Sequence, residues 1–157
     1  MQTESWIAYC GYLIWLSAGL GDFMCHRATD LPHTSGVAES FTHLLQLTLL
    51  GIAIVIALAF QVSAPILLLV GAFVVGHAIV GYWDTRIAFR RKRVLLPIEQ
   101  HIHSVLDMAP LIAFGWLLGR TWTTAAATWS IELRNPAVAV QIWLAVLVPA
   151  TVMCVVP

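Results

Sequence analysis

Charged side chains are scarce in this sequence. Asp, Glu, Lys and Arg make up 10% of its 157 residues and hydrophobic residues make up 60%, whereas a typical soluble domain is about 25% charged. This composition argues against an ordinary soluble protein and indicates one that is embedded in membrane lipid. The eight basic residues balance the eight acidic ones and form no long stripe, so nucleic acid is not an expected partner.

Cysteine is rare as well. Cys10, Cys25 and Cys154 lie within apolar segments and show no CxxC spacing, which argues against a disulfide framework and favours small packing residues. The sequence contains no internal repeat, and its 157 residues suffice for one compact bundle but not for a second domain. We therefore expect residues 1–157 to form a single transmembrane helical domain.

Five apolar runs are long enough to cross a bilayer as helices, which takes about 20 residues. They cover approximately residues 5–25, 37–61, 64–90, 98–119 and 136–156. Pro97 suits the first position of the fourth helix, where its missing N–H is not needed. A tight turn is expected at 61–65, and an interfacial loop or short surface helix at 120–135. The predicted fold is all-α, with five transmembrane helices of which the first four form a bundle.

Basic residues are distributed unevenly around these spans. Six of them flank the end of the first span, the end of the third and the start of the fourth, and only Arg120 and Arg134 belong to the other side. By the positive-inside rule the N-terminus faces out and the C-terminus faces the cytoplasm. We expect an integral protein of a bacterial cytoplasmic membrane.

Ionisable residues inside the spans are concentrated and regularly spaced. All six histidines lie between residues 26 and 103, and five of the eight acidic residues accompany them. Each such residue costs about 2.5–3.5 kcal/mol on insertion scales, so their retention indicates a function. The groupings are Asp22 with His26, Glu39 with His43, His77 with Asp84, and Glu99 with His103 and Asp107.

The predicted topology brings these groupings to the cytoplasmic ends of four helices. Residues four apart lie on one helix face, where a carboxylate and an imidazole can hold one ion or bridge to a second. We therefore predict a dimetal site near the cytoplasmic side, between the first four helices. Its candidate ligands are Asp22, His26, Glu39, His43, His77, Asp84, Glu99, His101 and His103.

Three polar residues in or near the segment 26–103 are assigned other roles or have a role that stays open. Asp107 is the candidate catalytic residue, an acid that relays protons beside the metals. His101 lies about 200° around the helix from Glu99, so its role as a ligand or as an orienting partner stays open. His33, in the loop at 30–36, is placed to cap the site from the cytoplasm.

Imidazole and carboxylate ligands without thiolate suit iron, manganese or zinc. Two iron ions are our first choice, with zinc or manganese as alternatives. The ligand pattern of residues 22–107 resembles that of the membrane-bound di-iron hydroxylases and desaturases, although it lacks an HxxHH box and carboxylates replace many histidines. In architecture it is also similar to the four-helix-bundle dimetal carboxylate proteins. The strings at 21–27 and 35–40 resemble a family of small bacterial integral-membrane proteins.

The first resemblance implies a di-iron oxidoreductase or oxygenase that acts on a lipid-soluble small-molecule substrate and draws on an electron donor. Divalent-metal transport or metal handling is an alternative, although a transporter needs polar residues in the outer half of the spans. A zinc-dependent membrane hydrolase is a further alternative, although it needs only three ligands and a base. The fifth span carries no ionisable residue except Cys154 and is expected to support the bundle or to contact a second copy in a homo-oligomer.

Overall fold

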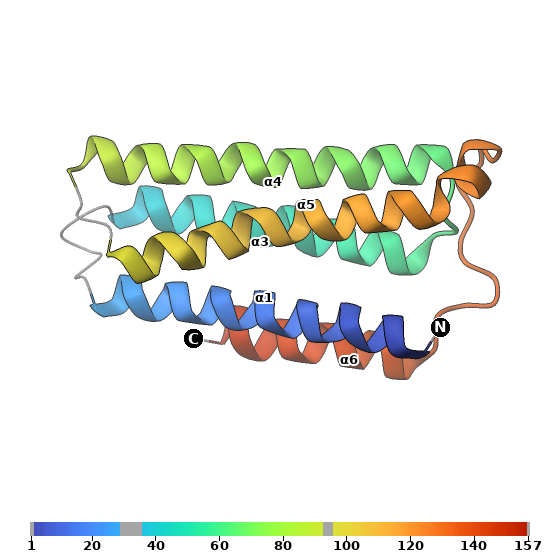
Figure 1. Cartoon of the computed structure of the whole chain (residues 1–157), viewed down its shortest axis with the longest axis horizontal. Helices are drawn as coiled ribbons and strands as arrows, with labels where there is room; N and C mark the ends of the chain where they lie inside the picture. The colour runs from blue at the N-terminus through green and yellow to red at the C-terminus, as the bar shows by residue number, and fades with distance from the viewer. Residues whose placement is uncertain (1, 29–35, 93–95, 157) are drawn as a thin grey trace.

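Helices account for almost all of the computed structural model, which describes residues 2–28, 36–92 and 96–156. The helices are α1 (Gln2–Ala28), α3 (Gly36–Ala59), α4 (Ala64–Arg90), α5 (Pro97–Ala126) and α6 (Val140–Ala150), and α6 continues into the π-helical turn η1 (Thr151–Val155). The four long helices run along one axis in alternating directions (Figure 1). The all-α prediction is confirmed.

Four of the described helices are long and apolar enough to cross a membrane. α1, α3, α4 and α5 contain 27, 24, 27 and 30 residues, and about 20 suffice to span the hydrocarbon core. Large apolar side chains such as Ile79, Phe89 and Ile112 are exposed on the outside of the bundle, as they are on a surface that faces lipid. The structure is thus consistent with a membrane protein.

The fifth predicted span is shorter than expected. α6 contains 11 residues and η1 contains five, so the helix from Val140 to Val155 rises about 24 Å, less than the hydrocarbon thickness of about 30 Å. The first residues of the predicted span, 136–139, are not helical. The prediction of five membrane-spanning helices is therefore supported for four of them.

Tyrosine hydroxyls attach this short helix to α1. Tyr9 donates to the Ala145 carbonyl at 3.1 Å and Tyr12 to the Val146 carbonyl at 2.6 Å. Pro149 lies four residues after Ala145 and has no N–H, so it leaves that carbonyl without its usual helical partner. The hydroxyl of Tyr9 replaces the missing donor.

The end of α5 differs from the prediction. The helix continues to Ala126, and only the segment 127–139 forms a loop. This loop folds over the turn between α3 and α4, where the backbone N–H of Gln61 donates to Glu132 at 2.9 Å and the Ser63 hydroxyl donates to Ser130 at 2.7 Å. The predicted α3–α4 turn is confirmed, and it lies at the end of the bundle opposite the ionisable groupings.

α4 is the most buried of the long helices. Val70 and Val74 pack against Leu50 of α3, and Gly71 allows the ring of Phe114 from α5 to lie against the α4 backbone, 2.7 Å from where a Cβ would stand. α1 packs against α5 and the C-terminal helix, and among the described residues it makes no extensive contact with α3. The bundle is therefore open between α1 and α3.

Candidate metal centre

Seven ionisable side chains meet where α1 and α4 end and where α3 and α5 begin. Four are carboxylates and three are imidazoles, and all are buried or half-buried. Each of the four long helices contributes at least one. We call them the polar cluster: Asp22 and His26 from α1, Glu39 and His43 from α3, Asp84 from α4, and Glu99 and His103 from α5.

Helix ends favour several of these charges. Glu39 lies in the first turn of α3 and Glu99 in the first turn of α5, where the positive end of the helix dipole stabilises a carboxylate. His26 lies in the last turn of α1, where the negative end of the dipole would favour a cation bound to its ring. Glu39 and Glu99 are only 1% and 0% exposed, so strong compensating interactions are needed to offset their burial.

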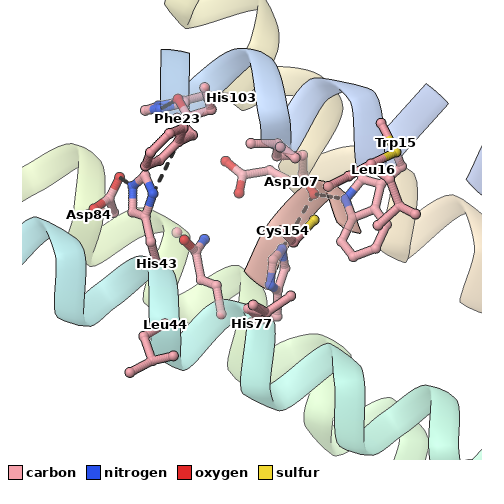
Figure 2. Close-up of a pocket in the computed structure, with 17 residues that line it drawn as sticks. Trp15, Leu16, Phe23, His43, Leu44, His77, Asp84, His103, Asp107 and Cys154 are labelled. Atoms are coloured by element: carbon pink, nitrogen blue, oxygen red, sulfur yellow. Dashed lines mark hydrogen bonds and ion pairs between the residues drawn. The ribbon is translucent and has the colours of Figure 1, made fainter. Parts of the chain in front are cut away.

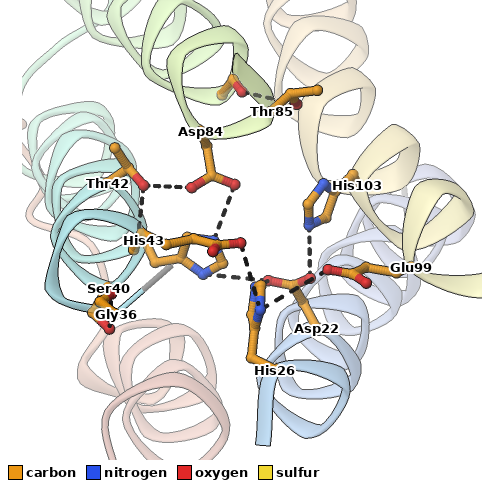
Figure 3. Close-up of polar contacts among 12 residues, drawn as sticks. Asp22, His26, Gly36, Ser40, Thr42, His43, Asp84, Thr85, Glu99 and His103 are labelled. Carbon is orange, nitrogen blue, oxygen red and sulfur yellow. Dashed lines mark hydrogen bonds and ion pairs between the residues drawn. The ribbon is translucent and has the colours of Figure 1, made fainter. Parts of the chain in front are cut away.

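Asp22 contacts three imidazoles from three helices. Its Oδ1 lies 2.8 Å from Nε2 of His103, and its Oδ2 lies 3.2 Å from Nε2 of His26 and 3.3 Å from Nδ1 of His43. Figure 3 shows the three rings turned toward this carboxylate. The i,i+4 pair of Asp22 and His26 lies on one helix face, as its spacing predicts.

The other ring nitrogen of His26 faces the two glutamates. Nδ1 lies 3.6 Å from Oε1 of Glu39 and 3.9 Å from Oε1 of Glu99. The ring therefore stands between Asp22 on one side and two carboxylates on the other. An ion bound at Nδ1 would have both glutamates within reach.

Asp84 reaches the cluster from α4 and orients His43. Its Oδ2 lies 3.2 Å from Nε2 of His43, and its Oδ1 contacts the hydroxyl of Thr42. A carboxylate that accepts an imidazole N–H fixes the tautomer and the ring orientation, which leaves Nδ1 of His43 directed at Asp22. The sequence reasoning missed Thr42, although its position three residues after Glu39 places it beside the cluster.

Three sets of these side chains have ligand atoms that all lie within 4.8 Å of one another. Every two of these sets share one residue. If His26 is counted only with the two glutamates, its other set keeps Asp22, His43 and His103. The cluster could then offer three protein ligands to each of two ions. The three sets are Asp22, His26, His43 and His103; His26, Glu39 and Glu99; and Glu39, His43 and Asp84.

Charge balance points to the same number of ions. The cluster contains four carboxylates, and neutral imidazoles add no charge. Two divalent cations would neutralise four negative charges, whereas one would leave two charges buried. Since uncompensated charge is costly in a low-dielectric interior, the donor set fits a pair of divalent ions.

The remaining predicted ligands lie outside this cluster. His101 is exposed, and its Nδ1 lies 2.8 Å from the Pro97 carbonyl. His77 lies deeper in the bundle, where its Nε2 donates to the Leu106 carbonyl at 3.4 Å. Neither belongs to a ligand set formed by the described residues. His33, the predicted cap, lies outside the residues that the structure describes.

Pro110 explains why the Leu106 carbonyl can accept bonds from other helices. It lies four residues after Leu106 inside α5 and supplies no N–H to close the helical hydrogen bond. The indole N–H of Trp15 donates to this carbonyl at 3.3 Å, beside the bond from His77. One freed carbonyl of α5 therefore links α1 and α4.

Asp107 and Gln46 approach each other over Gly81. A Cβ at Gly81 would lie 2.5 Å from Oδ1 of Asp107 and 3.0 Å from Nε2 of Gln46, so any larger residue would have to displace the ends of these two side chains. Together with His77 they form a second group, which we call the inner polar group. The sequence reasoning missed Gln46, although its position three residues after His43 places it on the same helix face.

A cavity of about 280 Å³ adjoins both groups. Phe23 and Leu44, which are 38% and 61% exposed, show that it reaches the surface between α1 and α3. Met153 and Cys154 of η1 form another part of its wall. Figure 2 shows Asp107, the predicted catalytic residue, in this cavity with side chains of the cluster. The cluster members that line it are Asp22, His43, Asp84 and His103.

Comparison with protein-family models gives no match to this chain, and comparisons with curated proteins and with solved structures give none either. The resemblances drawn from the sequence pattern therefore stay predictions. Function is therefore inferred from the geometry of the cluster and the cavity.

Proposed function

We propose that this chain is an integral-membrane oxidoreductase that binds two metal ions in the polar cluster, with iron as the first choice and zinc or manganese as alternatives. The observation that carries the proposal is the meeting of four carboxylates and three imidazoles from four helices, in overlapping ligand sets that can be divided into two groups of three residues. Mixed imidazole and carboxylate donors suit non-haem iron. When bound, such an iron pair supplies the binding and reduction of dioxygen.

The contacts suggest which side chains would bind each of the two ions. One ion would be held by Asp22, His103 and Nδ1 of His43, and Asp84 would orient His43 from its other nitrogen. The other ion would be held by His26, which faces both glutamates through Nδ1. Three protein ligands for each ion leave coordination positions open for reactants, as catalytic metal sites require.

The cavity provides access for a lipid-soluble substrate. It reaches the surface through the apolar side chains of Phe23 and Leu44, on a side of the bundle that would face hydrocarbon. A substrate dissolved in the bilayer would enter there without crossing a polar surface. Asp107 lines the same cavity, and we propose that it delivers protons to the reacting molecule.

The orientation is part of the proposal. The polar cluster lies at the end of the bundle that carries Arg86, Arg90 and Arg91, which the positive-inside rule assigns to the cytoplasm. The N-terminus, at the opposite end of α1 (Figure 1), would then face out. A fifth crossing would require the short C-terminal helix to reach the inner surface, but Cys154 near its end lies beside Gly19, within α1.

The test is the metal content of protein purified in mild detergent, measured by elemental analysis. We expect about two iron ions per chain, and loss of iron in Glu39→Ala and in His103→Ala while the helical circular-dichroism signal is kept. His101→Ala is the matched control, because His101 is exposed on the same helix and its removal should leave the metal content unchanged.

The alternative functions predict other results. Zinc in place of iron, with no dependence of activity on oxygen or reductant, would favour the hydrolase or metal handling. Protein that binds no stoichiometric metal after loading with iron, manganese or zinc would overturn the proposal.

A further inference from the structure

The cavity beside the cluster is lined by polar groups at two depths of the bundle and by apolar side chains. Asp22 and His103 belong to the polar cluster, and Asp107 and Gln46 belong to the inner polar group. Along α5, His103 and Asp107 are one helical turn apart, about 6 Å. Leu16, Leu47 and Leu106 contribute apolar walls.

This distribution argues against a simple alkyl chain as the occupant. A hydrocarbon chain that filled the cavity would place Asp107 and Gln46 against methylene groups, and burial of polar groups without hydrogen-bond partners is costly. A rigid apolar body with a polar atom at each end would match polar groups about 6 Å apart along α5 and the apolar walls.

The size of the cavity restricts the occupant further. Its volume of about 280 Å³ is just below the usual range of about 300–1,000 Å³ for small-molecule sites, so it suits one substituted ring and not a whole lipid. Trp15 contributes an aromatic wall and Phe23 an aromatic side chain at the mouth, and aromatic rings stack favourably on such surfaces.

The opening of the cavity leaves room for the apolar tail of a lipid-soluble molecule. α1 and α3 do not pack extensively against each other among the described residues, and Phe23 and Leu44 are both exposed and part of the cavity wall. An apolar tail would pass between these helices and stay in the bilayer while the ring occupies the cavity.

We propose that this cavity binds the head ring of a lipid-soluble para-quinol, with one oxygen near the polar cluster and the other near Gln46 and Asp107. The inference rests on the proposed dimetal function, which it completes by naming the reductant. Oxidation of one quinol to the quinone releases two electrons and two protons. Two quinols and one dioxygen therefore give two quinones and two water molecules, and no separate electron-donor protein is needed.

The first test is binding of a short-tailed benzoquinone to the purified chain in detergent, by equilibrium titration of both metal-loaded and chelated protein. The oxidised quinone is used so that binding does not depend on electron transfer. We expect saturable binding at about one molecule per chain, weakened about tenfold in Gln46→Leu because a hydrogen-bond donor in the cavity wall is lost. The metal content of this variant should be unchanged.

Thr48→Val is the matched control. Thr48 is also on α3, but it is exposed, does not line the cavity and donates to the Leu44 carbonyl of its own helix. Binding in this variant should equal that of the parent chain. Equal binding in Gln46→Leu as well would indicate partition into detergent and would overturn the assignment.

The second test separates this inference from the proposed function. Anaerobic addition of quinol to the di-ferric protein should produce about two ferrous ions for each quinol oxidised, detected with a ferrous chelator. Iron-loaded protein that neither binds the quinone nor is reduced would overturn the quinol assignment and leave the dimetal site standing. Quinone binding by a chain that takes up no iron, manganese or zinc when these metals are supplied would support the cavity assignment and overturn the dimetal function.

Discussion

The carboxylate of Asp107 occupies space that any side chain at Gly81 would need. A Cβ at Gly81 would stand 2.5 Å from Oδ1 of Asp107, closer than a carbon and an oxygen can approach. Glycine at position 81 therefore lets the side chain of Asp107, the predicted catalytic residue, lie against the α4 backbone beside the cavity.

Gly81→Ala should displace the carboxylate of Asp107, and the chain should gain less than the about 0.5–1 kcal/mol usual for glycine to alanine in a helix, because two side-chain ends must move to admit the methyl. Chemical denaturation in detergent measures the change. Gly115→Ala is the control: nothing lies within 4 Å of its Cβ position, and a helical glycine replaced by alanine gains about 0.5–1 kcal/mol. Equal effects in the two variants would contradict the contact.

Tyr9 and Pro149 should be energetically coupled. Tyr9→Phe removes the hydrogen bond to the Ala145 carbonyl and should cost about 1 kcal/mol. In a Pro149→Ala background the cost should fall, because the alanine N–H can bond that carbonyl within the helix. A double-mutant cycle measures the coupling. Tyr12→Phe should show no such coupling, since its acceptor Val146 lies three residues before Pro149 and not four.

Thr42→Val should weaken metal binding by about 10–100-fold, the usual effect of removing a group that orients a ligand. The hydroxyl contacts Asp84, which in turn holds His43. Competition with a chelator of known affinity measures the change. Ser40→Ala is the control, because Ser40 is exposed and bonds only the Gly36 carbonyl of its own helix among the contacts described. A Thr42→Val variant with the metal affinity of the parent chain would show that the Thr42 hydroxyl is not needed to orient Asp84.

Acid should release the metals. Imidazole and carboxylate ligands must be deprotonated to bind, so protons compete with the ions and apparent affinity falls as pH falls. We expect most of the loss between about pH 7 and pH 5, where imidazoles ordinarily take up protons. Metal retained after dialysis at stepped pH gives the profile. The His101→Ala variant should follow the parent curve, and retention throughout this range would argue against histidine ligation.

Hydropathy located the four long helices because their apolar runs are as long as the membrane is thick. Hydropathy did not predict the end of α5, because the helix continues beyond the end of its apolar run. Arg120 lies beyond the apolar run, yet it remains helical and pairs with Glu4 of α1 at 2.8 Å. Hydropathy also overestimated the last helix, because residues 136–139 are apolar but not helical.

The spacing of four residues predicted the members of the cluster better than the spacing of seven. Asp22 and His26 are one turn apart and contact each other, whereas His77 and Asp84 share a face but lie two turns, about 10 Å, apart. His77 therefore joins the inner polar group. The exposure of His101 follows from its position two residues before His103, on nearly the opposite side of α5. Thr42 and Gln46 carry no charge, so composition gave no reason to select them.

The opening between α1 and α3 is bridged at one end by the cluster itself. Asp22 of α1 lies 3.3 Å from His43 of α3, and His26 of α1 lies 3.6 Å from Glu39 of α3. These contacts join two helices that otherwise pack little against each other, so the polar cluster also closes one end of the opening. If the cluster binds metal as proposed, metal binding should narrow this opening, and molecules should then exchange between the cavity and the bilayer at a rate that depends on metal occupancy.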